Sequence, residues 1–106
     1  MEVERITGNE LKPLLEGTKE KLVVLFTATW CGYCCCLENE MKDSKLDFRV
    51  IAVDVSDESD GAWDDYKIEV VPTALLFKGT TELGRKAASR SGLNVKSIKD
   101  LFASHA

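Results

Sequence analysis

All four cysteines of this 106-residue chain fall within six consecutive positions, from Cys31 to Cys36. Disulfide frameworks of small secreted domains spread an even number of cysteines along the chain, so that their bridges join distant segments. Cysteines this close together cannot cross-link a fold, so a hydrophobic core has to hold the chain together. The chain is long enough for one such core, and we expect a single domain over residues 1–106.

Composition and charge exclude several classes of partner. Apolar residues make up 44% of the chain and charged residues 30%, as in ordinary globular proteins, and the net charge is -4. An acidic chain is a poor partner for nucleic acid or an anionic membrane. The longest apolar run, Leu22 to Phe26, is too short to span a membrane, and Met1 to Arg5 lacks the features of a signal peptide. We therefore expect a cytoplasmic protein.

Apolar, β-branched runs alternate with segments of helical periodicity along the chain. The runs predict strands at Leu22–Phe26, Phe48–Val55 and Thr73–Lys78, a weaker strand near Val3–Ile6, and a hairpin partner at Glu82–Lys86. The periodic segments predict helices from the Thr7–Glu10 capping box to Gly17, from Cys31 to Lys42, more weakly from Ser59 to Tyr66, and after an Asn94 cap. This alternation predicts an α/β fold, a mixed central β-sheet flanked by helices on both faces.

Cys31 and Cys34 are placed in a way that suits redox chemistry. Cys31 lies where an apolar strand gives way to a helix, and the unpaired N–H groups of a helix start favour its thiolate. Cys34 follows one turn later, with Cβ atoms about 5–6 Å apart in a regular helix. A disulfide needs about 3.5–4.5 Å, so a modest adjustment would close the bridge. The pair is therefore a candidate dithiol, one thiol attacking a partner disulfide and the other resolving the intermediate.

The stretch Trp30-Cys31-Gly32-Tyr33-Cys34 after an apolar strand, with Val71-Pro72-Thr73 opening a later strand, resembles the thioredoxin family. The resemblance spans roughly Val3 to Phe102 and implies the thioredoxin fold. It implies a thiol–disulfide oxidoreductase, either a protein disulfide reductase or isomerase-like, that serves cell redox homeostasis and electron transport. It also implies that Cys31 is the nucleophile, Cys34 the resolving thiol and Pro72 a cis-proline. The residues that would bind substrate are Trp30, Gly32, Tyr33, Val71, Pro72 and Thr73.

The same resemblance implies the partners of the chain. Its substrates would be protein disulfides, and a reductase or a small-thiol electron donor would return the electrons. No cofactor, nucleic acid or membrane is expected, and we expect a monomer. The pair Gly32-Tyr33 differs from the Gly-Pro of ordinary thioredoxins and resembles some bacterial disulfide isomerases, so the direction of electron flow stays open.

Two positions depart from the family pattern. Thioredoxins usually carry a buried acid six residues before the first cysteine, and many carry a lysine near it on the next strand. Leu25 and Ala52 occupy these places here. Because the acid is thought to move protons for the resolving cysteine, we expect slower resolution and a longer-lived mixed disulfide.

The two appended cysteines have no assigned role in the resemblance. At about 100° per residue, Cys34 joins an apolar stripe with Leu37 and Met41, whereas Cys35 faces outward with Glu38 and Lys42. Cys35 is thus a possible extra resolving thiol, and Cys36 points to the flank; both could equally be tolerated residues without a role.

A second class of function stays open. The cysteine cluster, with Cys31, Cys34 and Cys35 as ligands, could make the chain a thioredoxin-like module that binds a metal or an iron–sulfur cluster. Structural zinc sites draw their ligands from two separated segments, and contiguous cysteines on one helix cannot all face one ion. The oxidoreductase is therefore the favoured function, with no metal site expected.

Overall fold

The computed structural model describes residues 3–90 and 92–105, and within them it has five strands and four helices. The elements follow the predicted order, β-α-β-α-β-α-β-β-α. In chain order they are β1 (Glu4–Thr7), α1 (Gly8–Glu16), β2 (Lys21–Thr27), α2 (Gly32–Lys42), β3 (Val50–Asp54), α3 (Ala62–Asp65), β4 (Thr73–Lys78), β5 (Thr81–Ala87) and α4 (Val95–Ala103).

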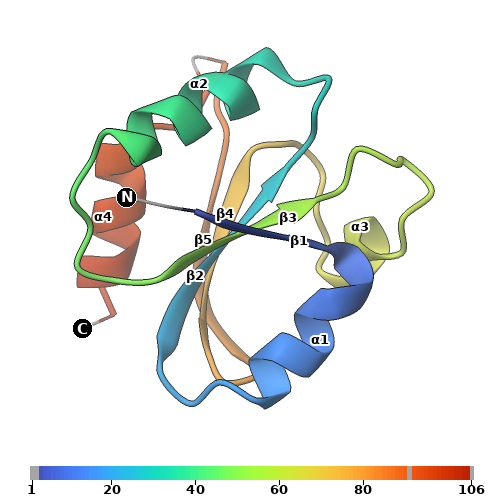
Figure 1. Ribbon diagram of the computed structural model, residues 1–106, viewed down its shortest axis with the longest axis vertical. Coiled ribbons are helices and arrows are strands. Elements are labelled where there is room, and N and C mark those ends of the chain that lie inside the picture. The colour runs from blue at the N-terminus through green and yellow to red at the C-terminus, as the bar shows by residue number, and fades with distance from the viewer. Residues whose placement is uncertain (1–2, 91, 106) are drawn as a thin grey trace.

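The strands form one mixed sheet in the order β1-β3-β2-β4-β5. Strands β1, β3 and β2 are parallel, whereas β4 runs antiparallel to β2 and β5 antiparallel to β4. Helices α1 and α3 lie on one face of the sheet and α2 and α4 on the other (Figure 1). The predicted mixed sheet with helices on both faces is confirmed. In the part of the chain that the structure describes, no helix has the length and apolar character needed to cross a membrane.

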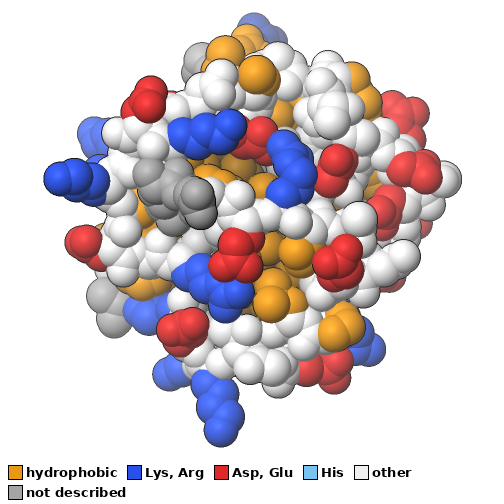
Figure 2. All heavy atoms as spheres, in the orientation of Figure 1, with side chains coloured by type: hydrophobic (Ala, Val, Ile, Leu, Met, Phe, Trp, Pro, Cys, Tyr) orange, Lys and Arg blue, Asp and Glu red, His pale blue; other side chains and the backbone are white. Residues whose placement is uncertain are grey.

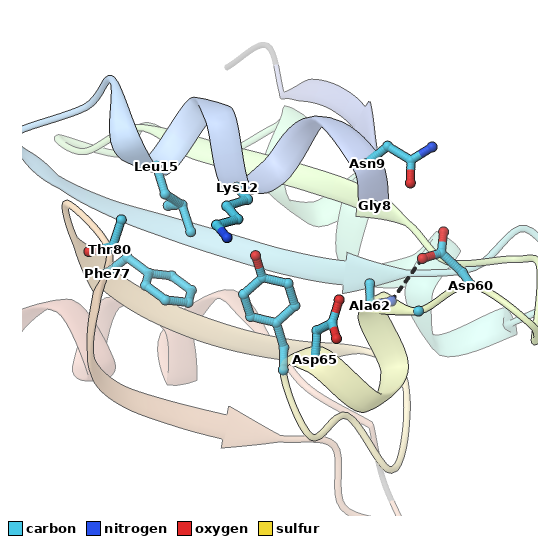
Figure 3. Close-up of a pocket in the computed structure, with 11 residues that line it drawn as sticks. Gly8, Asn9, Lys12, Leu15, Asp60, Ala62, Asp65, Phe77 and Thr80 are labelled. Carbon is cyan, nitrogen blue, oxygen red and sulfur yellow. Dashed lines mark hydrogen bonds between the residues drawn. The ribbon is translucent and has the colours of Figure 1, made fainter.

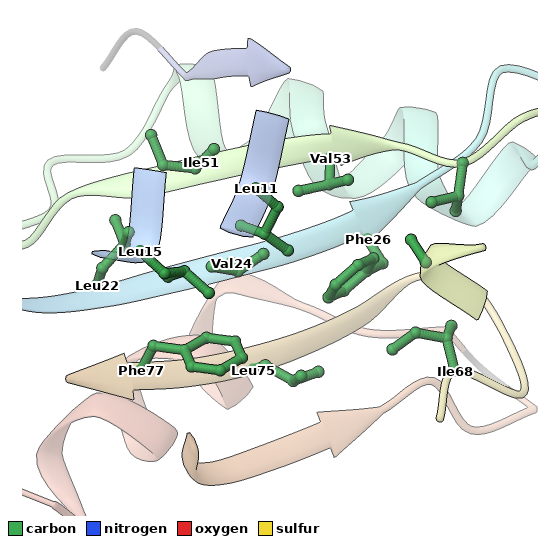
Figure 4. Close-up of a cluster of buried hydrophobic side chains, with 12 residues drawn as sticks. Leu11, Leu15, Leu22, Val24, Phe26, Ile51, Val53, Ile68, Leu75 and Phe77 are labelled. Carbon is green, nitrogen blue, oxygen red and sulfur yellow. The ribbon is translucent and has the colours of Figure 1, made fainter. Parts of the chain in front are cut away.

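Strand β2 is at the centre of the sheet and is buried on both faces. Leu22, Val24 and Phe26 belong to the apolar cluster under α1 and α3, whereas Val23 and Leu25 belong to the cluster under α2 and α4. Side chains of a strand alternate between the two faces, so an uninterrupted apolar run fills both clusters. Figure 4 shows the first cluster, in which Leu11 and Leu15 of α1 approach the sheet.

The end of the first cluster contains an aromatic group that fixes the segment after α3. The ring of Tyr66 lies 5.5 Å from that of Phe26 and 6.1 Å from that of Phe77, in tilted and edge-on arrangements. Such contacts favour these geometries over face-to-face stacking. They hold the chain that leads to β4 against the carboxyl end of β2.

Two predicted elements are shorter than the sequence suggested. The strand predicted at Phe48–Val55 is limited to Val50–Asp54, and Phe48 instead stacks on Phe102 with ring centroids 4.3 Å apart. The helix predicted at Ser59–Tyr66 is limited to Ala62–Asp65. Its first residues are held in turns, because carboxylate oxygens of Asp57 and Asp60 accept the N–H groups of residues 59 and 62, both at 2.9 Å.

The prediction of a capping box at the start of α1 is wrong, because the capping hydrogen bond from the helix backbone to Thr7 does not form. Thr7 is the N-cap residue, but its side chain makes no capping hydrogen bond to the helix. Its hydroxyl instead donates to the carboxylate of Glu10 at 3.0 Å. The cap of α4 forms as predicted, with Asn94 accepting from the N–H of Ser97 at 2.9 Å.

Acidic and basic side chains are interspersed over the face seen in Figure 2, with apolar surface between them.

A cavity of about 490 Å³ lies between the start of α1, helix α3 and the end of β4 (Figure 3). Lys12, Asp65 and Tyr66 are among the residues that line it, and none of the four cysteines is. The cavity is therefore separate from the thiols.

Candidate active site

The thiol pair lies at the junction of β2 and α2. Cys31 is the N-cap residue of α2, and its sulfur accepts a hydrogen bond from the N–H of Cys34 at 3.3 Å. This N–H is one of the unpaired donors of a helix start, so it stabilises negative charge on the Cys31 sulfur. Cys31 is 9% exposed and Cys34 is 1% exposed. All four cysteines are free thiols in this structure.

The loop before β4 closes over the pair. The peptide bond between Val71 and Pro72 is cis. The Cys31 thiol donates to the Val71 carbonyl oxygen at 3.5 Å, and the Val71 side chain packs against Ala28, Cys31 and Cys34. The fold therefore brings together two segments that are 40 residues apart in sequence.

The buried Thr73 side chain stabilises this loop with a hydrogen bond. Its side chain is 2% exposed, and its hydroxyl donates to the Val70 carbonyl oxygen at 2.7 Å. The side chain supports the loop before β4, and the substrate contact assigned to Thr73 stays a prediction.

Three exposed apolar side chains belong to the two segments that meet at the thiols. They are Trp30, Tyr33 and Val70, which are 55%, 51% and 42% exposed. The Trp30 indole N–H donates to the Ser56 carbonyl oxygen, and the Tyr33 hydroxyl donates to the Arg90 carbonyl oxygen, both at 2.9 Å. Each aromatic side chain is thus held at its polar end, and about half of it remains exposed.

A glycine is needed beside the Tyr33 ring. Gly92 has φ of +86°, and a Cβ placed on it would lie 2.8 Å from Tyr33 Cδ1. Both the backbone conformation and the close contact favour glycine over a residue with a side chain. Arg90 and Gly92 therefore both fix the position of the Tyr33 side chain.

The Cys34 thiol has an unusual environment. Burial raises the pKa of the Cys34 thiol to about 12, and the hydrogen bond with Cys31 acts in the same direction. The Ala28 N–H and the Thr27 side chain hydrogen-bond to the sulfur and lower this pKa, but by less. Cys34 is consequently a neutral thiol at neutral pH and has to lose its proton before it can act as a nucleophile.

The two departures from the family pattern lie side by side. Leu25 of β2 pairs with Ala52 of β3 in the parallel register, and they are 0% and 1% exposed. Leu25 packs in the same apolar cluster as Leu37 and Met41 of α2. The position that usually holds a buried acid is thus part of the hydrophobic core in this chain.

Cys35 and Cys36 lie on the exposed side of α2, whereas Cys34 lies on its buried side. Cys35 and Cys36 are exposed, and the Asn39 side-chain amide lies 3.8 Å from the Cys35 sulfur. The outward orientation predicted for Cys35 is confirmed.

The prediction that Glu38 faces outward with Cys35 is wrong. Its carboxylate turns toward the sheet, where it accepts from the Thr27 hydroxyl at 2.9 Å and forms an ion pair with Arg5 at 2.8 Å. One buried hydroxyl on β2 and one cation on β1 account for the inward orientation.

The metal-binding alternative is not supported. Within residues 3–90 and 92–105, no group of three or more His, Cys, Asp or Glu side chains is arranged to hold a metal ion. The geometry of α2 explains this for the cysteines, because Cys34 points into the core while Cys35 and Cys36 point to solvent.

Sequence comparison places the chain in a known family. The thioredoxin family model matches residues 2–100. The chain belongs to the thioredoxin family. The thioredoxin of Echinococcus granulosus is 31% identical over 106 residues, which cover 98% of this chain and 94% of that protein. The thioredoxin of Mycoplasmoides gallisepticum is 35% identical over 97 residues, which cover 88% and 91%.

Solved structures agree with this assignment. The fold matches Chlamydomonas reinhardtii thioredoxin f2 with a TM-score of 0.81 at 21% identity, over 98% of this chain and 96% of that one. It matches the reduced thioredoxin pre-protein of Schistosoma mansoni with a TM-score of 0.79 at 27% identity, over the full length of both chains. The predicted thioredoxin fold is confirmed. As a family member the protein is a thiol–disulfide oxidoreductase that acts on protein disulfides and is re-reduced by a reductase or thiol donor.

Proposed function

We propose that this thioredoxin-family protein reduces protein disulfides, with Cys31 as the nucleophile and Cys34 as the resolving thiol. The unequal burial of the two residues carries the assignment, since Cys31 is 9% exposed and Cys34 only 1%. A partner's disulfide can reach Cys31 at the helix start, where the Cys34 N–H meets its sulfur. Cys34 can react only with a disulfide already held at Cys31.

The reaction has two exchange steps. The Cys31 thiolate attacks one sulfur of the partner's disulfide, and the partner's second sulfur leaves as a thiolate that takes up a proton. Deprotonated Cys34 then attacks the Cys31 sulfur, which releases the partner's first sulfur. The partner gains two electrons, and the chain is left with a Cys31–Cys34 disulfide. A reductase or a small thiol returns the two electrons.

The apolar surface around the thiols would bind the partner. Trp30, Tyr33 and Val70 offer exposed apolar area, and a Cβ on Gly32 would have nothing within 4 Å, so a partner backbone can approach there. The backbone of Val71 would pair with an extended partner segment, as in strand addition. Pro72 and Thr73 would hold this loop in position.

We further propose that the chain acts as a monomer, as one domain, in a reducing compartment such as the cytoplasm. Four cysteines without a cross-linking bridge suit a reducing compartment. Reduction rather than isomerisation is favoured by the relatives, which are themselves named thioredoxins.

An insulin reduction assay with dithiothreitol as donor tests the proposal. The full chain should accelerate precipitation of the insulin B chain, and Cys31→Ser should abolish the acceleration. Thiol mapping after a redox titration should give one bridge, Cys31–Cys34. A parent chain no faster than dithiothreitol alone, with stoichiometric metal bound after reductive purification, would reject the oxidoreductase assignment.

A further inference from the structure

A line of polar side chains leads from the buried thiol to the surface. Thr27, which is 1% exposed, donates its hydroxyl proton to Glu38 Oε1 at 2.9 Å. The Arg5 guanidinium donates to both Glu38 carboxylate oxygens, at 2.9 and 2.8 Å. The Arg5 side chain is 44% exposed and that of Glu38 is 16% exposed, so the line ends at solvent.

The local geometry explains why these groups meet beside Cys34. Thr27 is the last residue of β2 and lies two positions after Leu25, so its side chain is on the same face of the sheet. Glu38 follows Cys34 by four residues on α2, a spacing that places side chains next to each other on a helix. The Thr27 hydroxyl thus donates to the Glu38 carboxylate on the side of α2 that carries Cys34, and the Thr27 side chain lowers the pKa of the Cys34 thiol.

We propose that Thr27 and Glu38 form a proton relay for Cys34, which takes the place of the buried acid that Leu25 replaces. This proposal rests on the roles of Cys31 and Cys34 proposed above. In this relay the Thr27 hydroxyl exchanges a proton with the Cys34 thiol, whereas Glu38 acts through Thr27. A hydroxyl suits this place because it can accept a proton on one side while it donates one on the other.

The proton and electron balance of the resolving step is complete. The Cys34 S–H passes its proton to Thr27 Oγ1 while the Thr27 hydroxyl proton passes to the Glu38 carboxylate. The Cys34 sulfur, now a thiolate, attacks the Cys31 sulfur of the mixed disulfide and the partner's thiolate leaves. Glu38 then releases its proton to solvent, or to the leaving thiolate by way of solvent. No oxidant beyond the mixed disulfide is needed.

Glu38 has access to solvent and faces charges from three elements. Arg5 of β1 and Lys42 of α2 line a hollow of about 140 Å³ together with Glu38. Asp54 of β3 lies near the same arginine. The ion pair with Arg5 holds the Glu38 carboxylate in place beside Thr27.

A two-phase exchange experiment separates attack from resolution. The background is the full chain with Cys35 and Cys36 replaced by serine, so that only the working pair can react. One equivalent of dithiobis(nitrobenzoate) releases a first coloured aryl thiolate when Cys31 attacks, and a second when Cys34 resolves the mixed disulfide. Loss of the first phase would reject the proposed function, whereas a change confined to the second phase tests the relay.

Glu38→Gln and Thr27→Val should slow the second phase by about 100-fold at neutral pH and leave the first phase unchanged, because only the second requires deprotonation of Cys34. Glutamine keeps an oxygen that accepts from Thr27, so the contact survives while the proton acceptor is lost. Thr27→Ser keeps the hydroxyl and should restore the parent rate. Glu40→Gln is the matched control on the same helix; it retains an acceptor for the Val95 N–H.

The pH profile distinguishes a relay from structural support. In Glu38→Gln, solvent hydroxide has to take the proton, so the second-phase rate should rise about tenfold per pH unit, more steeply than in the parent. A structural role would slow both phases and leave the slopes equal. Equal second-phase rates in the parent, Glu38→Gln and Thr27→Val would overturn the relay, as would equal slopes.

Discussion

The two halves of the cysteine cluster have the same residue type and opposite environments. Cys31 and Cys34 lie under the loop before β4, at the end of the central strand, and Cys34 is 1% exposed. Cys35 and Cys36 are on the same helix and in solvent. One residue of helical rotation, about 100°, separates the core from the surface. The burial of each thiol here therefore depends on its position around α2.

Loss of the proposed attacking thiol, Cys31, should lower activity more than any other change at the four cysteines. Cys31→Ser should lower insulin reduction to below about one-thousandth of the parent rate, because serine cannot form the mixed disulfide. Cys36→Ser is the matched substitution on the solvent side of α2 and should retain activity. Comparable losses in the two variants would erase the distinction between the buried and exposed halves.

Loss of the resolving thiol should trap an intermediate. Cys34→Ser should accumulate a stoichiometric adduct between Cys31 and the substrate, detectable by mass spectrometry without reductant, because the remaining thiols are exposed to solvent rather than buried under the loop before β4. Peptide mapping is the decisive measurement. A Cys31–Cys35 bridge in this variant would show that Cys35 can resolve the mixed disulfide. An exposed cysteine would then take part in the mechanism.

An acid at position 25 should destabilise the fold and accelerate resolution of the mixed disulfide. Leu25→Asp places a carboxyl group in the apolar cluster under α2 and α4, so the free energy of unfolding should fall by about 3 kcal/mol. The mixed disulfide should resolve faster in stopped-flow measurements, because a second proton acceptor is available. Leu25→Asn is the matched control, polar but unable to take the proton. Equal resolution rates in the parent and Leu25→Asp would sink the idea that the missing acid limits resolution.

Burial of Cys34 should also make stability depend on pH. The pKa of this thiol is about 12 in the folded chain and 9.0 for an unperturbed thiol, so the folded state holds a proton that the unfolded state loses between these values. The stabilisation is complete below pH 9 and is lost as pH rises, at up to about 1.4 kcal/mol per pH unit. Urea unfolding of the reduced chain across this window measures it. Cys34→Ala should lack this part of the slope, and a variant with the parent's slope would contradict the assignment.

The exposed thiols should give the smallest effects. Cys35→Ser and Cys36→Ser should each change the free energy of unfolding by less than about 0.5 kcal/mol, as expected for surface substitutions. Insulin reduction should stay close to the parent rate in both. A clear loss in Cys35→Ser alone would indicate a redox role for this thiol.

The sequence by itself determined the order of the elements, the strand at Thr73–Lys78 and the position of the thiol pair at a helix start. These features depend on local patterns, namely alternation, helical spacing and a short motif, which a linear sequence displays directly. The burial of Cys34 with Leu37 and Met41 follows from the same spacing.

Only the tertiary structure decided which distant groups meet at the site. Ser56 holds Trp30, Arg90 holds Tyr33, and Arg5 and Thr27 turn Glu38 toward Cys34. These partners are 11 to 57 residues apart in sequence, and no periodic pattern encodes such contacts. Exposed Val70 had a weak signal, an apolar residue directly before Val71-Pro72. The strands bring these side chains together, and the polar surroundings of the buried thiol arise from that packing.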